Sequence, residues 1–378
     1  MKYLRRIGKI EAGALVTIIL VSGLVSAGSI GLRINEPGRV YSIVQDIWTR
    51  EDVDDQSNTQ IHSTSIIYDE TNTPHVFYIT ANKELKRSFR TRIGWFEDTI
   101  DTNVIGRYVS AKIDSDGLIH VTYAKKGLMY LCGDETGWNE IELVDSSILV
   151  KKDTFVSIDL DSENNPQIAY YDEGNKDLKL ASKSNGIWEV QKIDTRGNVG
   201  MYCSIVMSSR DVAFISYYDT TNEDLKLAMA YSGIVVTKIA DSSNNFGLYS
   251  SIALDSEDNP YIVHSGVNGV KLTYLDGNDF VSELIDKDKT QCFTPSIVID
   301  GLDVIHVGFS KTMPGGPNLN IDIIYGRKTR FGWRFETAVD GTSFKDFPYG
   351  IDLGLDHNNR PAMSFVNIID GQLEFVFK

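Results

Sequence analysis

Short stretches in which hydrophobic and polar residues alternate recur along the chain, with turn residues between them. Residues 157–161 read Ser-Ile-Asp-Leu-Asp, the alternation typical of a β-strand with one buried face. An Asn-Pro or Asp-Gly pair then predicts a tight turn, and residues 168–171, Ile-Ala-Tyr-Tyr, indicate a second strand buried on both faces. Residues 177–181 predict a third strand, and a fourth starts after a glycine with an aromatic residue and ends at an aspartate.

This pattern returns with a period in the mid-forties, which is typical of repeat architectures. Residues 157–172 and 251–264 are close copies of each other, and weaker copies surround them. The residue that ends the first strand marks seven copies, and a serine replaces the aspartate once: Asp69, Asp114, Asp161, Ser208, Asp255, Asp300 and Asp356.

The fourth strand of each copy starts with a large apolar residue and closes with an acid. Every tryptophan of the chain lies at this starting position, and two other residues complete the set: Trp48, Trp95, Trp138, Trp188, Val235, Phe280 and Trp333. The closing acids are Asp54, Asp101, Asp145, Asp194, Asp241, Asp286 and Asp340. Because a tryptophan buries roughly 150–250 Å², we expect this position to supply the main packing between neighbouring copies.

The order of the copies predicts a closed ring. A fourth strand at residues 47–54 precedes any first strand, whereas the last copy stops at residues 375–378 after its third. An open solenoid would need polar caps at both ends, and the sequence shows none. We therefore predict an all-β fold, in which residues 34–378 form a seven-bladed β-propeller of four-stranded blades and the N-terminal strand closes the last blade.

These residues resemble secreted prokaryotic seven-bladed β-propeller repeat proteins, with copies built on Asn-Pro turns, Tyr-Tyr-Asp, Asp-Leu-Lys and Gly-x-Trp. The resemblance covers about residues 40–378, and in architecture it extends to sialidase-related and fucose-lectin propellers. It implies the fold and export more firmly than an activity. The sialidase spacing Ser-x-Asp-x-Gly-x-x-Trp does not occur in the chain, which argues against sialidase chemistry.

Residues 1–33 predict a signal peptide or a membrane anchor. Basic residues at positions 2, 5, 6 and 9 precede an uncharged run over residues 12–32, a predicted hydrophobic helix long enough to cross about 30 Å of hydrocarbon. Small residues before Gly28 also suit cleavage after residue 27. Both alternatives stay open, and both place the propeller outside the cell or on its surface, anchored in the cytoplasmic membrane if the segment is retained.

Charge and cysteine content narrow the function classes. With 37 basic and 52 acidic residues the net charge is -15, which argues against nucleic acid or anionic lipid as the main partner. The three cysteines, Cys132, Cys203 and Cys292, are far apart, and we expect buried thiols rather than a disulfide framework.

Aromatic residues at the start of the first strands are the best ligand candidates. Tyr108, Phe155, Tyr202 and Tyr249 share one position, and Phe293 and Tyr349 lie one residue earlier in their copies. The acidic turns that follow Asp172 and Asp219 should emerge on the same face of a propeller, around the mouth of the central channel. Aromatic faces beside carboxylates suit a glycan. The predicted ligand-binding residues are Tyr108, Tyr202, Tyr249, Tyr349, Asp172 and Asp219.

Each of these features also has a purely structural interpretation. The aromatic residues could plug the seams between blades, and the acidic turns could be ordinary Asx turns instead of a Ca²⁺ site. His75, His120 and His306 share one repeat position, which favours a structural role over a metal site.

No local motif supplies a catalytic nucleophile, a phosphate-binding loop or a singled-out pair of carboxylates. The segment Lys311–Asn320, which lengthens one connection, carries no acid, histidine or cysteine. We therefore predict no catalytic residue and no cofactor, and a non-catalytic binding or adhesion propeller for a glycan or an envelope protein. Two alternatives stay open: an extracytoplasmic glycoside hydrolase or lyase, and a structural component of a surface layer or filament.

Overall fold

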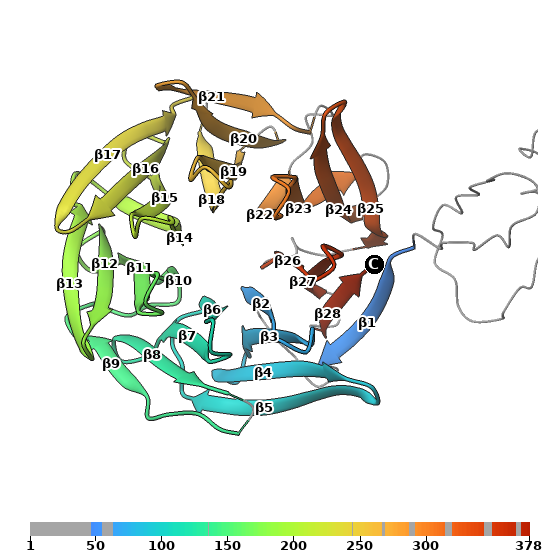
Figure 1. Ribbon diagram of the computed structural model, residues 1–378, viewed down its shortest axis with the longest axis horizontal. Coiled ribbons are helices and arrows are strands. Elements are labelled where there is room, and N and C mark those ends of the chain that lie inside the picture. Colours follow the sequence, from blue (N-terminus) through green and yellow to red (C-terminus); the bar gives the residue numbers. More distant parts are fainter. Residues whose placement is uncertain are drawn as a thin grey trace, which may run out of the picture. The chain divides into compact units, whose positions relative to one another are not determined.

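Seven four-stranded antiparallel sheets form blades around a central channel, as predicted (Figure 1). The structure is a computed structural model that describes residues 47–54, 63–134, 136–243, 245–266, 269–286, 292–313, 320–343, 350–367 and 372–378. The predicted helix and the domain boundary near residue 33 lie outside these residues. In the described ranges no helix has the length and apolarity to cross a membrane.

Each blade runs from an inner first strand to an outer fourth strand. Blade 1 consists of β2 (Thr64–Tyr68), β3 (Pro74–Ile79), β4 (Glu84–Thr91) and β5 (Gly94–Thr102), and blade 2 of β6 (Val109–Ile113), β7 (Ile119–Ala124), β8 (Leu128–Gly133) and β9 (Glu142–Asp145). Blade 3 consists of β10 (Val156–Leu160), β11 (Pro166–Asp172), β12 (Asp177–Ser184) and β13 (Ile187–Asp194), and blade 4 of β14 (Val199–Met207), β15 (Ala213–Asp219), β16 (Asp224–Tyr231) and β17 (Ile234–Asp241).

The remaining blades follow the same order until the chain ends. Blade 5 consists of β18 (Phe246–Leu254), β19 (Pro260–Gly266), β20 (Gly269–Asp276) and β21 (Asp279–Leu284), and blade 6 of β22 (Cys292–Ile299), β23 (Ile305–Met313), β24 (Asn320–Thr329) and β25 (Gly332–Ser343). Blade 7 consists of β26 (Asp352–Leu355), β27 (Pro361–Asn367), β28 (Gln372–Phe377) and, from the other end of the domain, β1 (Thr49–Asp54).

Blade 7 closes the ring as the order of the copies predicted. Strand β1 pairs antiparallel with β28, from Thr49 opposite Phe377 to Asp54 opposite Leu373. The sheet order β1-β28-β27-β26 places the first and last described strands side by side (Figure 1). The first and last blades are thereby tied into one ring.

The second strands are buried on both faces, whereas the fourth strands form the exposed outer wall. The indoles of the fourth strands lie between blades. Trp188 packs edge-on against Tyr130 of blade 2 with ring centroids 5.1 Å apart, and its Nε1–H donates to Glu142 at 2.7 Å. Trp138 departs from the prediction, since it makes only an isolated bridge with Gly133 and β9 begins four residues later, yet its Nε1–H still bonds blade 1.

One side chain of each inner strand holds the next blade. It accepts a hydrogen bond, at 2.8 to 3.3 Å, from the backbone N–H of the neighbouring inner strand. This interblade ring consists of Ser65, Ser110, Ser157, Ser204, Ser251, Ser296 and Asp352. Asp352 bonds Ile66 of blade 1, so the ring of bonds is complete.

Six of the seven predicted closing acids also bind the following blade, whereas Asp340 is exposed and lies within β25. Asp145 of blade 2 accepts from the Tyr170 hydroxyl at 2.7 Å and from Lys179 at 3.2 Å, both in blade 3. Burial opposes ionisation, but hydrogen bonds from Ser147 and Tyr170 and the charge of Lys179 outweigh it and lower the pKa of Asp145. These predicted acids are therefore part of the interblade contacts.

Candidate functional site at the channel mouth

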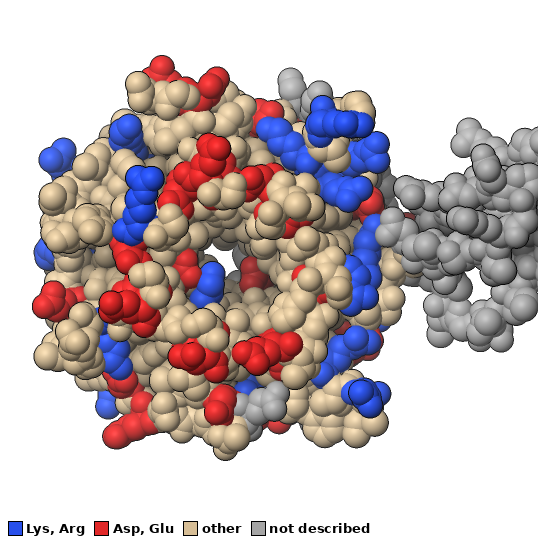
Figure 2. All heavy atoms as spheres, in the orientation of Figure 1, with Lys and Arg blue, Asp and Glu red and all other residues tan. Residues whose placement is uncertain are grey.

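The topology gives the ring two different faces. The connections from strand two to three and from strand four to the next strand one lie on one face, which we call the mouth face. The turns from strand one to two and from strand three to four lie on the other, which we call the hairpin face. Figure 2 shows the central opening of the ring.

A cavity of about 140 Å³ lies where the inner strands begin on the mouth face, and every blade contributes to it. Its lining residues are Ser63, Thr64, Tyr108, Phe155, Val156, Tyr202, Cys203, Tyr249, Ser250, Thr294, Pro295, Gly350 and Ile351. These are equivalent positions of the seven copies. Such a volume holds several ordered waters, which the hydroxyl groups of a ligand could replace.

Four aromatic rings from consecutive blades form one half of the wall. The ring centroids of Tyr108 and Phe155 are 4.2 Å apart, those of Phe155 and Tyr202 4.5 Å, and those of Tyr202 and Tyr249 4.4 Å. We call these four residues the aromatic crescent. The same position holds small residues in the other three blades, namely Thr294, Gly350 and Ser63. The wall is therefore aromatic on one side and formed by small residues on the other.

The backbone turns these side chains toward the channel at a local cost. Tyr202 (φ 55°), Tyr249 (φ 52°) and Thr294 (φ 45°) all adopt the left-handed region. The strand pairing is interrupted at the same point in blades 4, 5 and 6. Bulky and β-branched residues avoid this region, and strain of this kind costs of order 1–3 kcal/mol per residue. The strain is concentrated at one position of the inner strands, where the crescent residues of blades 4 and 5 lie.

Thr294 carries a second cost. Its side chain is only 6% exposed, and its Oγ1 is buried without a hydrogen-bond partner among the described residues. A buried hydroxyl without a partner destabilises the folded state by roughly 1–3 kcal/mol. The residue lines the cavity in blade 6, next to Tyr249 of blade 5, and we expect a ligand hydroxyl there to bond it.

The structure brings three of the predicted ligand residues together. Tyr108, Tyr202 and Tyr249 all belong to the crescent, and Tyr349 lies outside the described residues. Burial, with the neighbouring Tyr249 and Tyr202 hydroxyls, raises the pKa of Tyr108 well above its usual range. The phenol of Tyr108 therefore stays neutral and can donate a hydrogen bond.

The two predicted aspartates do not line this cavity. Asp172 accepts from Asn175 in its own turn at 2.8 Å and pairs with Lys179 at 2.7 Å. Asp219 accepts from Asn222 at 2.9 Å and is 3.6 Å from the Lys226 ammonium. Both carboxylates are buried and engaged within the protein, so we leave them out of the proposed site.

The sequence analysis did not single out a pair of charged residues inside the channel. Lys112 Nζ lies 3.0 Å from Asp159, and this neighbouring carboxylate raises the pKa of Lys112. Burial raises the pKa of Asp352, which occupies the position of a serine in the interblade ring. The equivalents of Lys112 and Asp159 in other copies, such as Val206 and Val298, are apolar, so comparing the copies position by position would have revealed this pair.

The histidines of the shared repeat position are structural. The Nε2 atoms of His75, His120 and His306 lie 3.0, 3.1 and 3.4 Å from the aspartate that ends the first strand of the same blade. Across the described ranges no group of three or more His, Cys, Asp or Glu side chains could hold a metal, and the alternative of a Ca²⁺ site in the acidic turns stays untested.

The three cysteines are free thiols. Cys203 and Cys292 are buried, as predicted, and Cys132 is half-buried. Cys203 also lines the channel-mouth cavity, and burial raises its pKa to about 12. It is therefore a neutral thiol and not a nucleophile.

Comparison with known proteins supports the propeller fold and assigns the chain to no family. No family model and no curated protein matches the sequence. AofleA from Arthrobotrys oligospora is 12% identical over 79% of this chain and 91% of its own, with a TM-score of 0.50. A protein of unknown function from Dyadobacter fermentans is 10% identical over 74% of this chain and 96% of its own, also with a TM-score of 0.50. A lectin from Aleuria aurantia, described as a six-bladed propeller with a novel fucose recognition mode, is 13% identical over 75% of this chain and 96% of its own. Its TM-score is 0.49. Such likeness shows the propeller fold alone.

Proposed function

We propose that this protein is an extracytoplasmic propeller that binds a glycan at its channel mouth without catalysing a reaction. The aromatic crescent, facing small polar residues and a buried Thr294 hydroxyl with no partner among the described residues, carries this proposal. Pyranose C–H groups stack on aromatic faces, and sugar hydroxyls both donate and accept hydrogen bonds. A single sugar unit therefore matches both halves of the wall.

The hydrolase alternative has less support in the described residues. Glycoside cleavage needs two carboxyl groups, either about 5–5.5 Å or about 6.5–9.5 Å apart. No acidic residue is among the described residues that line the cavity, and the nearby channel carboxylate of Asp159 is paired with Lys112.

The surface-layer alternative is supported by exposed apolar residues of the outer strands β13 and β17, such as Ile187 and Ile234. A concentration-dependent oligomeric state would support it.

Export remains part of the proposal and rests on the sequence of residues 1–33. The intact mass of the native protein distinguishes a cleaved signal peptide from a retained anchor. An envelope protein as the partner is the alternative to a glycan, and binding to an envelope extract but to no glycan would favour it.

A glycan panel tests the proposed function directly. We expect the full chain to retain at least one glycan class and Tyr249→Ala to bind it about tenfold or more weakly, since loss of one stacking partner removes about 1.4 kcal/mol. Tyr231→Ala is the matched control, because Tyr231 is an exposed tyrosine on the hairpin face. No retention on the panel, or equal loss in both variants, would contradict the proposal.

A further inference from the structure

The turns between third and fourth strands follow two designs. In blades 3 and 4 the two turn residues are Asn185-Gly186 and Ser232-Gly233, with positive φ at both positions (50° and 79°, 49° and 81°). Small polar residues are the usual choice for such hairpin turns. These tips carry no cation.

The tips of blades 1 and 6 share another pattern. Residues 91–95 read Thr-Arg-Ile-Gly-Trp and residues 329–333 read Thr-Arg-Phe-Gly-Trp. In each, the threonine hydroxyl donates to the glycine carbonyl, at 2.9 and 2.8 Å, and accepts from the N–H of the apolar residue, at 3.3 and 3.2 Å. Two segments far apart in the sequence therefore form the same kind of turn. In each, an arginine and an apolar residue lie at the exposed tip.

The outward residues are unusually exposed. Ile93 (86%), Leu302 (79%) and Phe331 (76%) are the three most exposed large apolar side chains of the described residues, and Leu302 lies in the first turn of blade 6 on the same face. Arg92 and Arg330 are also exposed, and neither has a carboxylate partner in the described part of the chain. The Arg330 guanidinium lies 4.7 Å from the centre of the Phe331 ring.

The two tips flank the place where the chain joins the propeller. Blade 7 lies between blades 6 and 1, and its fourth strand, β1, begins at Thr49 on the hairpin face. The first described strand therefore begins on the face of these tips. Figure 2 shows Lys and Arg side chains gathered over this side of the ring, where Figure 1 places β24, β25 and β1.

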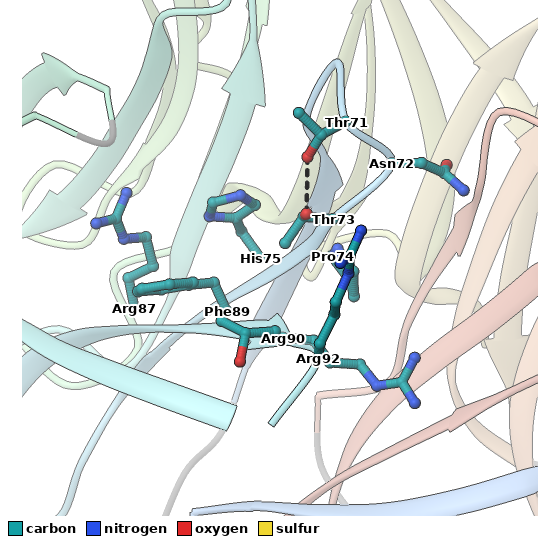
Figure 3. A pocket seen from close by; sticks show the side chains of 10 residues that line it. Thr71, Asn72, Thr73, Pro74, His75, Arg87, Phe89, Arg90 and Arg92 are labelled. Atoms are coloured by element: carbon teal, nitrogen blue, oxygen red, sulfur yellow. Dashed lines mark hydrogen bonds between the residues drawn. The ribbon is translucent and has the colours of Figure 1, made fainter. Parts of the chain in front are cut away.

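A groove of about 750 Å³ lies beside the blade 1 tip. Figure 3 shows Arg90 from β4 and Arg92 from the turn after it on one side, and Thr71, Asn72 and Thr73 from the turn between β2 and β3 on the other. Arg90 is held by Glu51 at 2.8 and 2.6 Å, which leaves the Arg92 charge available for a ligand. Polar groups around a cation suit a phosphate ester.

We propose that the tips of blades 1 and 6, together with this groove, dock on an anionic lipid bilayer, so that the channel mouth points away from the membrane. The inference rests on the retained-anchor alternative of the proposed function. Arginine meets lipid phosphates, while isoleucine and phenylalanine enter the boundary between headgroups and acyl chains. The net charge of -15 opposes such a surface for the molecule as a whole, but this field is screened beyond roughly 8–10 Å and the tips are local.

The test uses the full chain reconstituted in nanodiscs of phosphatidylglycerol or phosphatidylcholine. A small fluorophore is attached at Ile93→Cys, Phe331→Cys or, as a control across the ring, Asn185→Cys, in a Cys132→Ser background. Headgroup-level nitroxide lipids should quench the first two labels in phosphatidylglycerol and leave the third unaffected. We expect Arg92→Glu to lower the docked fraction at the label on position 331 at least fivefold, equivalent to about 1 kcal/mol, and Lys238→Glu on the far outer strand to have no effect.

The possible failures are distinguishable. A chain that does not incorporate into nanodiscs contradicts the anchor, and with it this inference, whether or not the glycan panel succeeds. A chain that incorporates but shows no quenching, or quenching independent of Arg92, overturns the docking surface alone. Labels that respond to protein concentration instead of lipid would also overturn it, and would assign the tips to a contact between two copies.

Discussion

Thr294 combines a left-handed backbone with a buried hydroxyl that no described residue satisfies. We expect Thr294→Val, which keeps the shape and removes the hydroxyl, to raise the free energy of unfolding by about 1 kcal/mol and to weaken glycan binding. Thr273→Val is the matched control, because the Thr273 Oγ1 lies 2.7 Å from both His264 Nε2 and Ser282 Oγ and its loss should destabilise. Urea denaturation measures both, and equal destabilisation would show that the Thr294 hydroxyl already has a partner.

His264 makes stability depend on mildly acidic pH. Burial lowers its pKa to about 3, although Asp241 is 3.9 Å away, and Lys271 adds to the shift. The unfolded chain takes up this proton near pH 6.5, so stability is full above that pH and falls as the pH drops from about 6.5 toward 3. His264→Gln should flatten the fall between about pH 6.5 and 4.5, before the carboxylates titrate. Thermal denaturation against pH measures it, with exposed His357→Gln as control. An unchanged slope in His264→Gln would contradict the assignment.

Single residues were only partly predictable. The aromatic residues at the start of the inner strands stood out because they recur, and three of the predicted tyrosines do meet in one cavity. Thr294 did not stand out, because its importance comes from its backbone conformation and an unmet hydrogen bond, which residue type does not reveal. Asp172 and Asp219 looked available in sequence, but a turn aspartate bonds its own backbone and neighbours first.

At the scale of strands, we expect substitutions in the interblade ring to destabilise the fold more than substitutions at exposed turns. Ser110 Oγ accepts from the buried Ile158 N–H at 3.2 Å. Ser110→Ala leaves this N–H without a partner, and we expect a loss of roughly 1–3 kcal/mol in the free energy of unfolding. Ser184→Ala, at an exposed hairpin tip, should change it by less than about 0.5 kcal/mol. Similar values from chemical denaturation would show that the serine bonds do not hold neighbouring blades.

Strand existence followed from alternation, since inner and second strands bury fixed faces and leave a clear pattern. The fourth strand of blade 2 was less predictable. Asp134 accepts from the Thr136 N–H and hydroxyl, at 2.7 and 2.6 Å, which builds a longer tip and delays β9 to Glu142. A side chain bonding its local backbone competes with the ladder, and the position of Trp138 alone could not show that.

At the scale of the whole ring, closure by β1 should dominate resistance to unfolding. A disulfide from Thr49→Cys and Phe377→Cys, which are direct partners, closes a loop that spans the domain and should add upwards of about 4 kcal/mol in the chain-entropy account. The same bridge from Ser184→Cys and Ile187→Cys closes one turn and should add roughly 2 kcal/mol or less. Thermal unfolding in oxidised and reduced states compares them, and a larger gain from the turn would contradict closure through β1.

The number of blades and the closure of the ring were predictable, because the copies can be counted and the incomplete ones lie at the two ends. Which functional side chains lie on which face of the ring could not be predicted from the sequence. The Arg-Ile and Arg-Phe tips are far apart in sequence, and only the ring places them on either side of the strand where the chain joins it. Whole-chain net charge conceals such local arrangements.

The most direct test of the account is a crystal structure of the protein soaked with the glycan that the panel identifies. The account predicts density for a sugar ring against the faces of Tyr108, Tyr202 or Tyr249, with a hydroxyl within hydrogen-bond distance of Thr294 Oγ1. Density in the grooves of the hairpin face, with an empty channel mouth at saturating glycan, would contradict it.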